Sequence, residues 1–316
     1  MVVHSYDPTL DIVKDFDNGT KKVLENEIEP VIQIYYMNML NKSTIRQRIT
    51  SGYEAKAAIN RFRPKILIAV GDEAQEFAAK FYVGKKKMRV LFSGVKGDIQ
   101  KFGYEPGKNV GAVIEEPQMH ELNILINDMF EGKKNIRLAH LGDTSTMVNL
   151  TEKILIRHAW KNVSFTDSVK VNSYTDFKEA ATMLSKQCDV LLISSYRALK
   201  NVENVEDEIV SDEMMKWVVK NTSIPIISTL GYTVEDGAGA AIVSSAYDQG
   251  MMAMGSALTM LNNEHFLPNV LSKVFAVFLN EDHISERGVC MPSIYKSFAV
   301  GTQKLFNYHK VHGASL

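Results

Sequence analysis

Cysteine is nearly absent from this chain, whose 316 residues include only Cys188 and Cys290. Two cysteines so far apart in the sequence exclude a disulfide framework as the main source of stability. Buried or unpaired thiols are the simpler expectation, and a single bridge between the two stays open. Cysteine content therefore does not decide the redox compartment.

Long apolar runs and an excess of one charge are also missing. No run approaches the ~20 residues of a membrane-spanning helix, and no basic-then-apolar leader opens the chain. Residues 2–5 already have the pattern of a strand, which fits either a cytosolic protein or a processed form of a longer precursor. The formal net charge is -1. Because neither charge dominates, we expect no nucleic-acid partner. Because no apolar run is long enough, we also expect no direct insertion into a membrane.

The familiar motifs of metal sites and catalysis are absent as well. The sequence has no HExxH, no paired CxxC and no Asp-rich loop, so we expect no metal. Gly237-Ala-Gly239 lacks the third glycine of a dinucleotide fingerprint, and we expect no cofactor. No Gly-x-Ser-x-Gly elbow presents a nucleophile, and Ser93 and Ser194 have no identifiable base. A non-enzymatic protein is the expectation.

Five short apolar runs end in small polar residues. They lie at residues 65–72, 89–94, 137–143, 189–195 and 225–231. Runs of this kind are typical of parallel strands buried on both faces. Ligands of open α/β sheets bind just outside the carboxyl ends of such strands. Because two runs precede residue 100 and three follow residue 135, the sequence predicts two sheets.

Strands and helices alternate along almost the whole chain, which predicts an α/β fold of two Rossmann-like lobes with right-handed crossovers. Asp72 is expected to cap the helix that it begins. The chain is expected to pass between lobes at 112–116 and 242–246. Helices are predicted at 8–27, 43–62, 72–82, 117–131, 145–160, 175–186, 207–221 and 246–262, and strands at 2–5, 31–36, 65–70, 89–92, 109–114, 136–141, 162–166, 189–194, 224–228, 240–244 and 274–279.

Seven stretches, taken in order, resemble a known family. They are Val3–Pro8, Pro64–Gln75, Val90–Val95, Pro106–Gly111, Ser194–Leu199, Val234–Gly237 and Ser244–Gly250. The chain is similar to the substrate-binding proteins of ABC transporters with the type I periplasmic-binding fold. More narrowly, it resembles the branch described as uncharacterised or aromatic-amino-acid-type.

The resemblance implies two lobes joined by a hinge, with a small polar organic ligand, amino-acid-like compounds included, held between them. The N-terminal lobe would take residues 1–113 and 246–273, and the C-terminal lobe residues 114–245 and 274–316. The implied partner is an ABC permease, and the implied location is periplasmic or extracytoplasmic, with or without a membrane tether on the precursor. A ligand-sensing domain for a signalling partner such as a histidine kinase is the alternative, and a cytosolic α/β enzyme is a third.

Small polar and aromatic residues at the strand ends are the candidate ligand contacts, because hydroxyls, backbone amides and helix N-termini there can orient a polar ligand. Helix capping competes with binding at Gly71-Asp72 and Gly142-Asp143. Arg197 is a candidate grip for a carboxylate, although an exposed role is equally compatible with its position. The candidates are Ser5, Tyr6, Gly71, Asp72, Ser93 and Gly94 in the first lobe, Asp143, Thr144, Ser145, Ser195, Tyr196, Thr229 and Tyr232 in the second, and Tyr247 and Asp248 after the second crossing.

Overall fold

The computed structural model of the chain describes residues 1–25, 30–42, 44–85, 87–96, 109–200, 211–263 and 269–306. Its contacts divide the chain into two compact units. Unit 1 comprises Met1–Glu116 and Ser244–Val274, and unit 2 comprises Pro117–Val243 and Phe275–Leu316. The chain therefore passes from one unit to the other three times.

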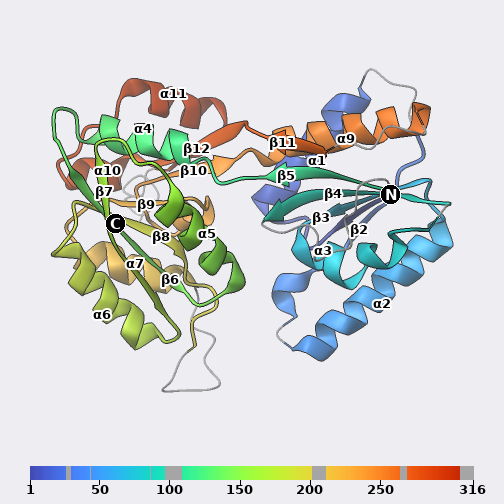
Figure 1. The fold of residues 1–316 in the computed structure, drawn as a ribbon, viewed down its shortest axis with the longest axis horizontal. Helices are drawn as coiled ribbons and strands as arrows, with labels where there is room; N and C mark the ends of the chain where they lie inside the picture. The colour runs from blue at the N-terminus through green and yellow to red at the C-terminus, as the bar shows by residue number, and fades with distance from the viewer. Residues whose placement is uncertain are drawn as a thin grey trace, which may run out of the picture. The chain divides into compact units, whose positions relative to one another are not determined.

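Unit 1 is built on a sheet with the strand order β11-β5-β4-β3-β1-β2 in the described part of the chain (Figure 1). All five neighbouring pairs are parallel, so their carboxyl ends meet at one edge. The strands are β1 (Val2–His4), β2 (Ile34–Tyr36), β3 (Ile66–Val70), β4 (Arg89–Lys96), β5 (Val110–Glu115) and β11 (Asn269–Ser272).

Helices cover both faces of this sheet, and the strand residues alternate between them (Figure 1). Leu67 and Ala69 pack into a cluster with Ile59 of α2, whereas Ile68 packs with Met254 of α9 on the other face. Burial on both faces explains why the strands read as continuous apolar runs. The helices are α1 (Asp11–Leu24), α2 (Ile45–Phe62), α3 (Asp72–Phe77) and α9 (Ala246–Asn262), with the short 3-10 helices η1 (Met39–Asn41) and η2 (Ala79–Tyr82).

Two glycines allow α1 and α9 to pack closely. A Cβ on Gly19 of α1 would lie 1.9 Å from the Tyr247 carbonyl oxygen. A Cβ on Gly250 of α9 would lie 2.1 Å from the Phe16 carbonyl oxygen. No side chain fits at either position, so the two helix backbones are in direct contact there.

Unit 2 has the strand order β13-β12-β10-β9-β8-β6-β7 among its described residues. The pairs β6–β7, β6–β8, β8–β9, β9–β10 and β12–β13 are parallel, so this sheet also has a carboxyl edge. The strands are β6 (Ile136–Asp143), β7 (Val163–Val171), β8 (Val190–Ser195), β9 (Ile226–Ser228), β10 (Ala240–Ser244), β12 (Phe275–Asn280) and β13 (Leu305–Phe306).

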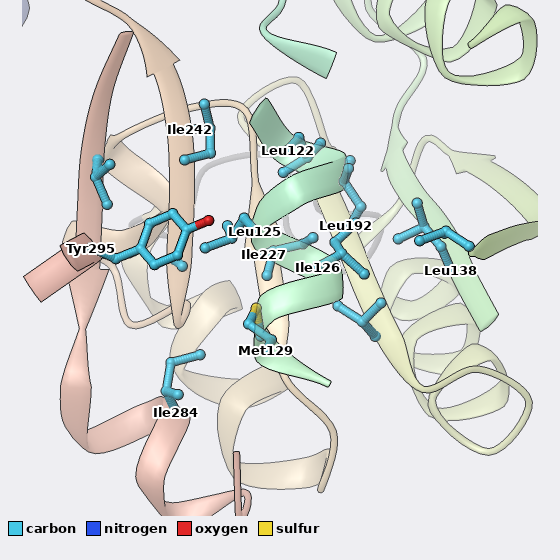
Figure 2. Close-up of a cluster of buried hydrophobic side chains, with 14 of the residues drawn as sticks. Leu122, Leu125, Ile126, Met129, Leu138, Leu192, Ile227, Ile242, Ile284 and Tyr295 are labelled. Atoms are coloured by element: carbon cyan, nitrogen blue, oxygen red, sulfur yellow. The ribbon is translucent and has the colours of Figure 1, made fainter. Parts of the chain in front are cut away.

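Helices cover both faces of this second sheet too. On one face Leu122, Leu125 and Ile126 of α4 pack against strand residues such as Leu192 and Ile227 (Figure 2). On the other face α6 and α7 cover alternate residues of the same strands. The helices are α4 (Met119–Met129), α5 (Thr146–Arg157), α6 (Tyr174–Ser185), α7 (Ser211–Asn221), α8 (Tyr232–Glu235), α10 (Glu281–Glu286) and α11 (Ser293–Gly301).

The predicted α/β fold with two mostly parallel sheets is confirmed. The helix predicted at 72–82 is wrong in its second half, because α3 ends at Phe77 and η2 follows. The expected helix start at residue 207 and residues 106–108 of the Pro106–Gly111 motif lie outside the described residues. Cys188 is buried and Cys290 is exposed, and both are free thiols. In the part of the chain that the structure describes, no helix combines the length and apolarity needed to cross a membrane.

Candidate functional site at the carboxyl edges of the two sheets

Ser5 and Gly71 together begin helix α3 at the carboxyl edge of unit 1. The predicted cap, Asp72, is wrong: Gly71 occupies the N-cap position, with a φ of +85°, and Asp72 is the first helical residue. Ser5 Oγ supplies the missing cap, since it accepts from the Ala74 amide (2.9 Å) and donates to the Val70 carbonyl (3.0 Å). A Cβ on Gly71 would lie 2.6 Å from that hydroxyl oxygen, so glycine is required there.

Beside this cap, β4 carries an extra residue that opens the edge of the sheet. Ser93 pairs with Val113 and Val95 pairs with the next residue of β5, so Gly94 is an added bulge residue with a φ of +64°. The Ser93 carbonyl accepts from the Gly71 amide (3.0 Å) and from Gln75 Nε2 (3.3 Å). The edge around Gly71 and Gly94 is therefore held together by the backbone of Ser93.

Two buried oxygens at this edge have no hydrogen-bond partner among the described residues. They are Ser93 Oγ and Gln75 Oε1, on side chains that are fully buried. A second amide oxygen, Gln249 Oε1, lies 3.5 Å from the place a Cβ would take on Gly94. Native proteins leave few buried polar atoms unsatisfied, so a water or a ligand group is the expected partner. Neither glutamine was anticipated, because each sits inside the first turn of its helix rather than directly after a strand.

The start of α9 supplies further polar side chains. Ser245 caps the helix: its Oγ accepts from the Asp248 amide (3.2 Å) and donates to Asp248 Oδ2 (2.5 Å). Asp248 is thus part of the cap, while Tyr247 is exposed. Tyr6 packs half-buried against the core of unit 1. Of these three predicted residues, only Tyr247 is exposed, at 37%.

A buried trio fixes the carboxyl end of β1. His4 Nε2 and Asp17 Oδ1 are 2.9 Å apart, and the Tyr36 hydroxyl donates to Asp17 Oδ2 (2.7 Å). The His4 and Tyr36 rings stack at 5.3 Å. Burial acts to raise the pKa of Asp17, but His4, Tyr36 and Lys21 outweigh it and lower the pKa below its ordinary value. These contacts keep a carboxylate charged beside the first strand.

In unit 2, Ser195, Arg197 and Tyr232 form a donor group at the carboxyl edge. The Arg197 guanidinium lies 3.6 Å from the Tyr232 ring centroid. Ser195 Oγ accepts from the Tyr232 hydroxyl (3.1 Å) and from the Arg197 amide (3.3 Å). Among the described residues its own proton has no acceptor, although the side chain is only 3% exposed. Burial raises the pKa of Tyr232 to about 12, so this phenol stays a donor.

Asp143 holds two loops of this edge together rather than facing outward. It is fully buried, and its two carboxylate oxygens accept from the amides of Ser145 (2.9 Å) and Ala198 (3.1 Å). Ser145 caps α5 through the Val148 amide. The exposed Thr144 donates to the Asn172 side chain. At Asp143 and Ser145 the structure therefore shows scaffolding contacts.

Tyr196 is placed in the core and does not face the edge. Its side chain is 1% exposed, and its hydroxyl donates to Asp236 Oδ2 (2.5 Å). An extra residue in β8 decides which of the two covered faces it takes: Ile193 pairs with Leu141 and Ser195 with Gly142, so Ser194 breaks the alternation. Tyr196 consequently continues the core face of Leu191 and Ile193. Thr229 lies half-buried just beyond β9.

A chain of hydrogen bonds links helix α5 to the neighbouring strands β7, β6 and β8 of the second sheet. Ser168 Oγ donates to Glu152 Oε1 (2.6 Å), so the hydroxyl can only accept from His140 Nδ1 (2.8 Å). His140 Nε2 must then accept from Ser194 Oγ (2.8 Å). Burial lowers the pKa of His140 to about 4, which agrees with a neutral ring. This network fixes the extra residue Ser194 in place.

The candidate residues thus gather in two sets, each at the carboxyl edge of its own sheet. The first set centres on Ser5, Gly71, Ser93 and Gly94, and the second on Ser195 and Tyr232. The described ranges hold no group of three or more His, Cys, Asp or Glu side chains arranged to bind a metal ion.

Comparison with known proteins finds similarity in structure only. No family model and no curated protein matches the sequence. A ligand-free, open substrate-binding protein with adhesive properties from Clostridium difficile is 18% identical, with a TM-score of 0.67 over 92% of this chain and 95% of that one. An ABC domain from Streptococcus pneumonia in complex with L-Trp is 16% identical, with a TM-score of 0.62 over 94% and 97%. A complex of the TorS sensor domain with TorT contains a chain that is 12% identical, with a TM-score of 0.52 over 92% and 96%.

Proposed function

We propose that this chain, which has the two-lobed α/β fold of periplasmic substrate-binding proteins, is an extracytoplasmic solute-binding protein. It holds a small zwitterionic organic ligand, such as an amino acid, and delivers it to an ABC permease. One observation carries the proposal: the carboxyl edge of unit 1 offers hydrogen-bond acceptors, whereas that of unit 2 offers a guanidinium and a free hydroxyl proton. The two edges would recognise opposite ends of one ligand.

The unit 2 edge suits a carboxylate. Arg197 presents a planar fork of donors that matches a carboxylate in geometry and charge. The Tyr232 ring beneath it, at 3.6 Å, restricts the motion of the guanidinium and so lowers the entropy lost on binding. Ser195 adds one more donor, because its two acceptor positions are already filled.

The unit 1 edge suits an ammonium group. Gln75 Oε1 and Gln249 Oε1 are acceptors near Gly71 and Gly94. Asp72 and Asp248 add carboxylates in the first turns of α3 and α9. The bound L-Trp of the structural neighbour from Streptococcus is a ligand of this zwitterionic kind. For this chain we propose that the ligand's ammonium binds these acceptors and its carboxylate binds Arg197.

The three passages between the units are proposed to act as a hinge between two lobes, residues 1–113 with 246–273 and residues 114–245 with 274–316. Ser244 Oγ donates to the Glu116 carbonyl (3.1 Å), and the Ser245 amide donates to the Val274 carbonyl (2.9 Å). These bonds tie the three passages to one another. Because the three segments are bonded to one another, they would bend together when the two lobes close.

A ligand screen tests the proposal directly. Purified protein is heated in the presence of amino acids, sugars, nucleosides and small organic acids and amines. Because a ligand that binds only the folded state must stabilise it, amino acids should raise the melting temperature. Compounds that lack either the carboxylate or the ammonium should raise it much less. A panel that gives no shift, or a shift from sugars alone, contradicts the proposal.

Two neighbouring substitutions separate binding from folding. Arg197→Gln should weaken the binding of the stabilising compound by ten- to a hundredfold, because charge-assisted bonds to the carboxylate are lost. Tyr196→Phe removes a core hydrogen bond instead, so it should lower stability and leave affinity near the wild-type value. Isothermal titration calorimetry measures both affinities. Unchanged affinity in Arg197→Gln contradicts the assigned carboxylate contact.

A sensing role is the second candidate, favoured by the similarity to the complex of the TorS sensor domain with TorT. The same ligand would then alter a signalling partner such as a histidine kinase rather than feed a permease. Ligand-dependent stimulation of a transporter's ATP hydrolysis supports delivery, and ligand-dependent kinase autophosphorylation supports sensing.

A further inference from the structure

Helix α2 carries an apolar stripe on its outer side. Ile45 and Tyr53 are each 65% exposed, and Ile49 between them is 44% exposed. Steps of four residues place these side chains in one row, ~12 Å long. The inner side of α2 instead packs through Ser51, Gly52, Ala55 and Ile59. Nothing in the hydrophobic core of unit 1 explains three large exposed side chains in register.

A fourth exposed side chain widens the stripe, and a lysine holds it in place. Lys56 Nζ lies 4.0 Å from the centroid of the Tyr53 ring and 4.2 Å from that of Phe81, which is 48% exposed. One ammonium between two exposed rings fixes both of them by cation–π attraction. The surface of Ile45, Ile49, Tyr53 and Phe81, named here the α2 stripe, is therefore partly preorganised.

The segment that carries the α2 stripe is basic in sequence. Residues 42–65 contain seven Lys or Arg and one acidic residue, Glu54, in a chain whose net charge is -1. Exposed Arg46 follows Ile45 directly. A second copy of this chain would bring these positive charges against one another, which disfavours self-association through this face. An acidic partner is favoured instead. The seven are Lys42, Arg46, Arg48, Lys56, Arg61, Arg63 and Lys65.

The position of α2 ties this surface to the proposed ligand edge. The helix follows β2, so its first turns lie at the carboxyl edge of the sheet, toward which the strand arrows of unit 1 point (Figure 1). Ile45 and Ile49 are in those first turns, and Ser93 and Gly94 end a strand at the same edge. A protein bound to the α2 stripe would therefore sit beside the edge proposed to hold the ligand.

We propose that the α2 stripe, with Arg46 and Lys56, docks on the ABC permease that receives the ligand. The docking segment of that protein pairs apolar side chains with acidic ones. The proposal rests on the proposed function, because that function requires such a partner. The four apolar side chains of the α2 stripe, with the Lys56 ammonium held between two rings, fit a protein groove, since interface hot spots are compact and aromatic-rich.

Binding to native membranes tests the docking surface. The protein is labelled with a fluorophore at the exposed Cys290 and titrated onto washed membranes of the organism that encodes it, onto the same membranes after protease treatment, and onto protein-free liposomes of their extracted lipids. Saturable binding to untreated membranes alone is expected. Ile49→Asp and Arg46→Glu should each weaken it at least tenfold. Ile156→Asp is the matched control, because Ile156 is an exposed isoleucine of α5 in unit 2, and it should bind like the wild type.

Three results would overturn the docking proposal. The first is equal membrane binding by Ile49→Asp and the wild type. The second is retained binding to the liposomes, which would make lipid the occupant of the α2 stripe. The third is a solution dimer that Ile49→Asp dissociates in analytical ultracentrifugation, which would make a second copy of the chain the occupant. Circular dichroism checks that each variant is folded, and Ile45→Ser serves as a milder replacement. The ligand screen is independent of these outcomes. Absence of any stabilising compound contradicts solute binding. Equal membrane binding by Ile49→Asp and Ile156→Asp contradicts docking.

Discussion

Histidine burial gives unit 2 a residue-scale sensitivity to acid. His140 is enclosed between Ser168 and Ser194, and burial lowers its pKa to about 4. His283 accepts the Ile226 amide, and burial lowers its pKa to about 3. Both rings are hydrogen-bonded in the neutral form, so a proton on either would leave a buried charge, and a proton on His283 Nε2 would also break the bond from the Ile226 amide.

Lowering the pH should therefore destabilise the protein. The unfolded chain protonates a histidine near pH 6.5, whereas the folded chain protonates His140 only near pH 4. Between these values the unfolded state binds more protons, so stability falls as the pH falls, by on the order of 3 kcal/mol in total for His140. Urea unfolding at pH 7, 6 and 5 measures this dependence.

His140→Gln is the variant that isolates this contribution. An amide can still contact both serines but does not titrate in this range. Between pH 6 and pH 5 the free energy of unfolding should fall less in His140→Gln than in the wild type. The difference between the two falls should be up to about 1.4 kcal/mol per pH unit. Equal slopes in the two proteins would show that protonation of His140 does not contribute.

Residues at the candidate site were only partly predictable, for reasons seen in particular side chains. The polar strand ends were found because apolar runs end there. The direction of their side chains was not, because the extra residue Ser194 turns Tyr196 onto the core face of Leu191 and Ile193, and no sequence pattern marks such a bulge. Ser5 and Asp143 could not be separated from ligand contacts, since capping and binding use the same atoms. Gln75 and Gln249 were missed because burial of a helical glutamine depends on tertiary packing.

At the scale of elements, long periodic segments were predictable and short ones were not. Except for β11 and β13, the described strands of both sheets follow from apolar runs that need no tertiary information. Helices α8 and α10 and strand β13 are shorter than the windows in which periodicity can be recognised. The close contact of α1 with α9 joins residues far apart in the sequence, so Gly19 and Gly250 carry no local signal of their role.

That helix contact yields a prediction with a control on the same helix. Gly250→Ala places a Cβ 2.1 Å from the Phe16 carbonyl oxygen, so the helices must separate. The free energy of unfolding should fall by about 1–3 kcal/mol or more. Gly255→Ala, also in α9, meets nothing within 4 Å and should raise it by up to about 1 kcal/mol, because alanine favours the helix. Urea denaturation compares them, and equal effects would contradict the packing of α1 on α9.

At the scale of the whole molecule, two units joined by three passages can change their relative position without unfolding either core. Each core is closed by its own helices. A ligand shifts such an equilibrium only through contacts that differ between the states. The proposed ligand, with its ammonium at unit 1 and its carboxylate at Arg197 of unit 2, would make both sets of contacts only in a closed state.

Small-angle X-ray scattering should therefore show a smaller radius of gyration when a stabilising compound from the ligand screen is at saturation. A compound from the same panel that gives no thermal shift should leave the radius unchanged. Arg197→Gln, measured at the concentration that saturates the wild type, should remain near the ligand-free value, because one of the two sets of contacts is weakened. A radius that stays constant while calorimetry shows full occupancy would mean that one unit binds the ligand alone. Closure would then have no energetic cause, and the bonds from Ser244 and Ser245 would serve only to join the units.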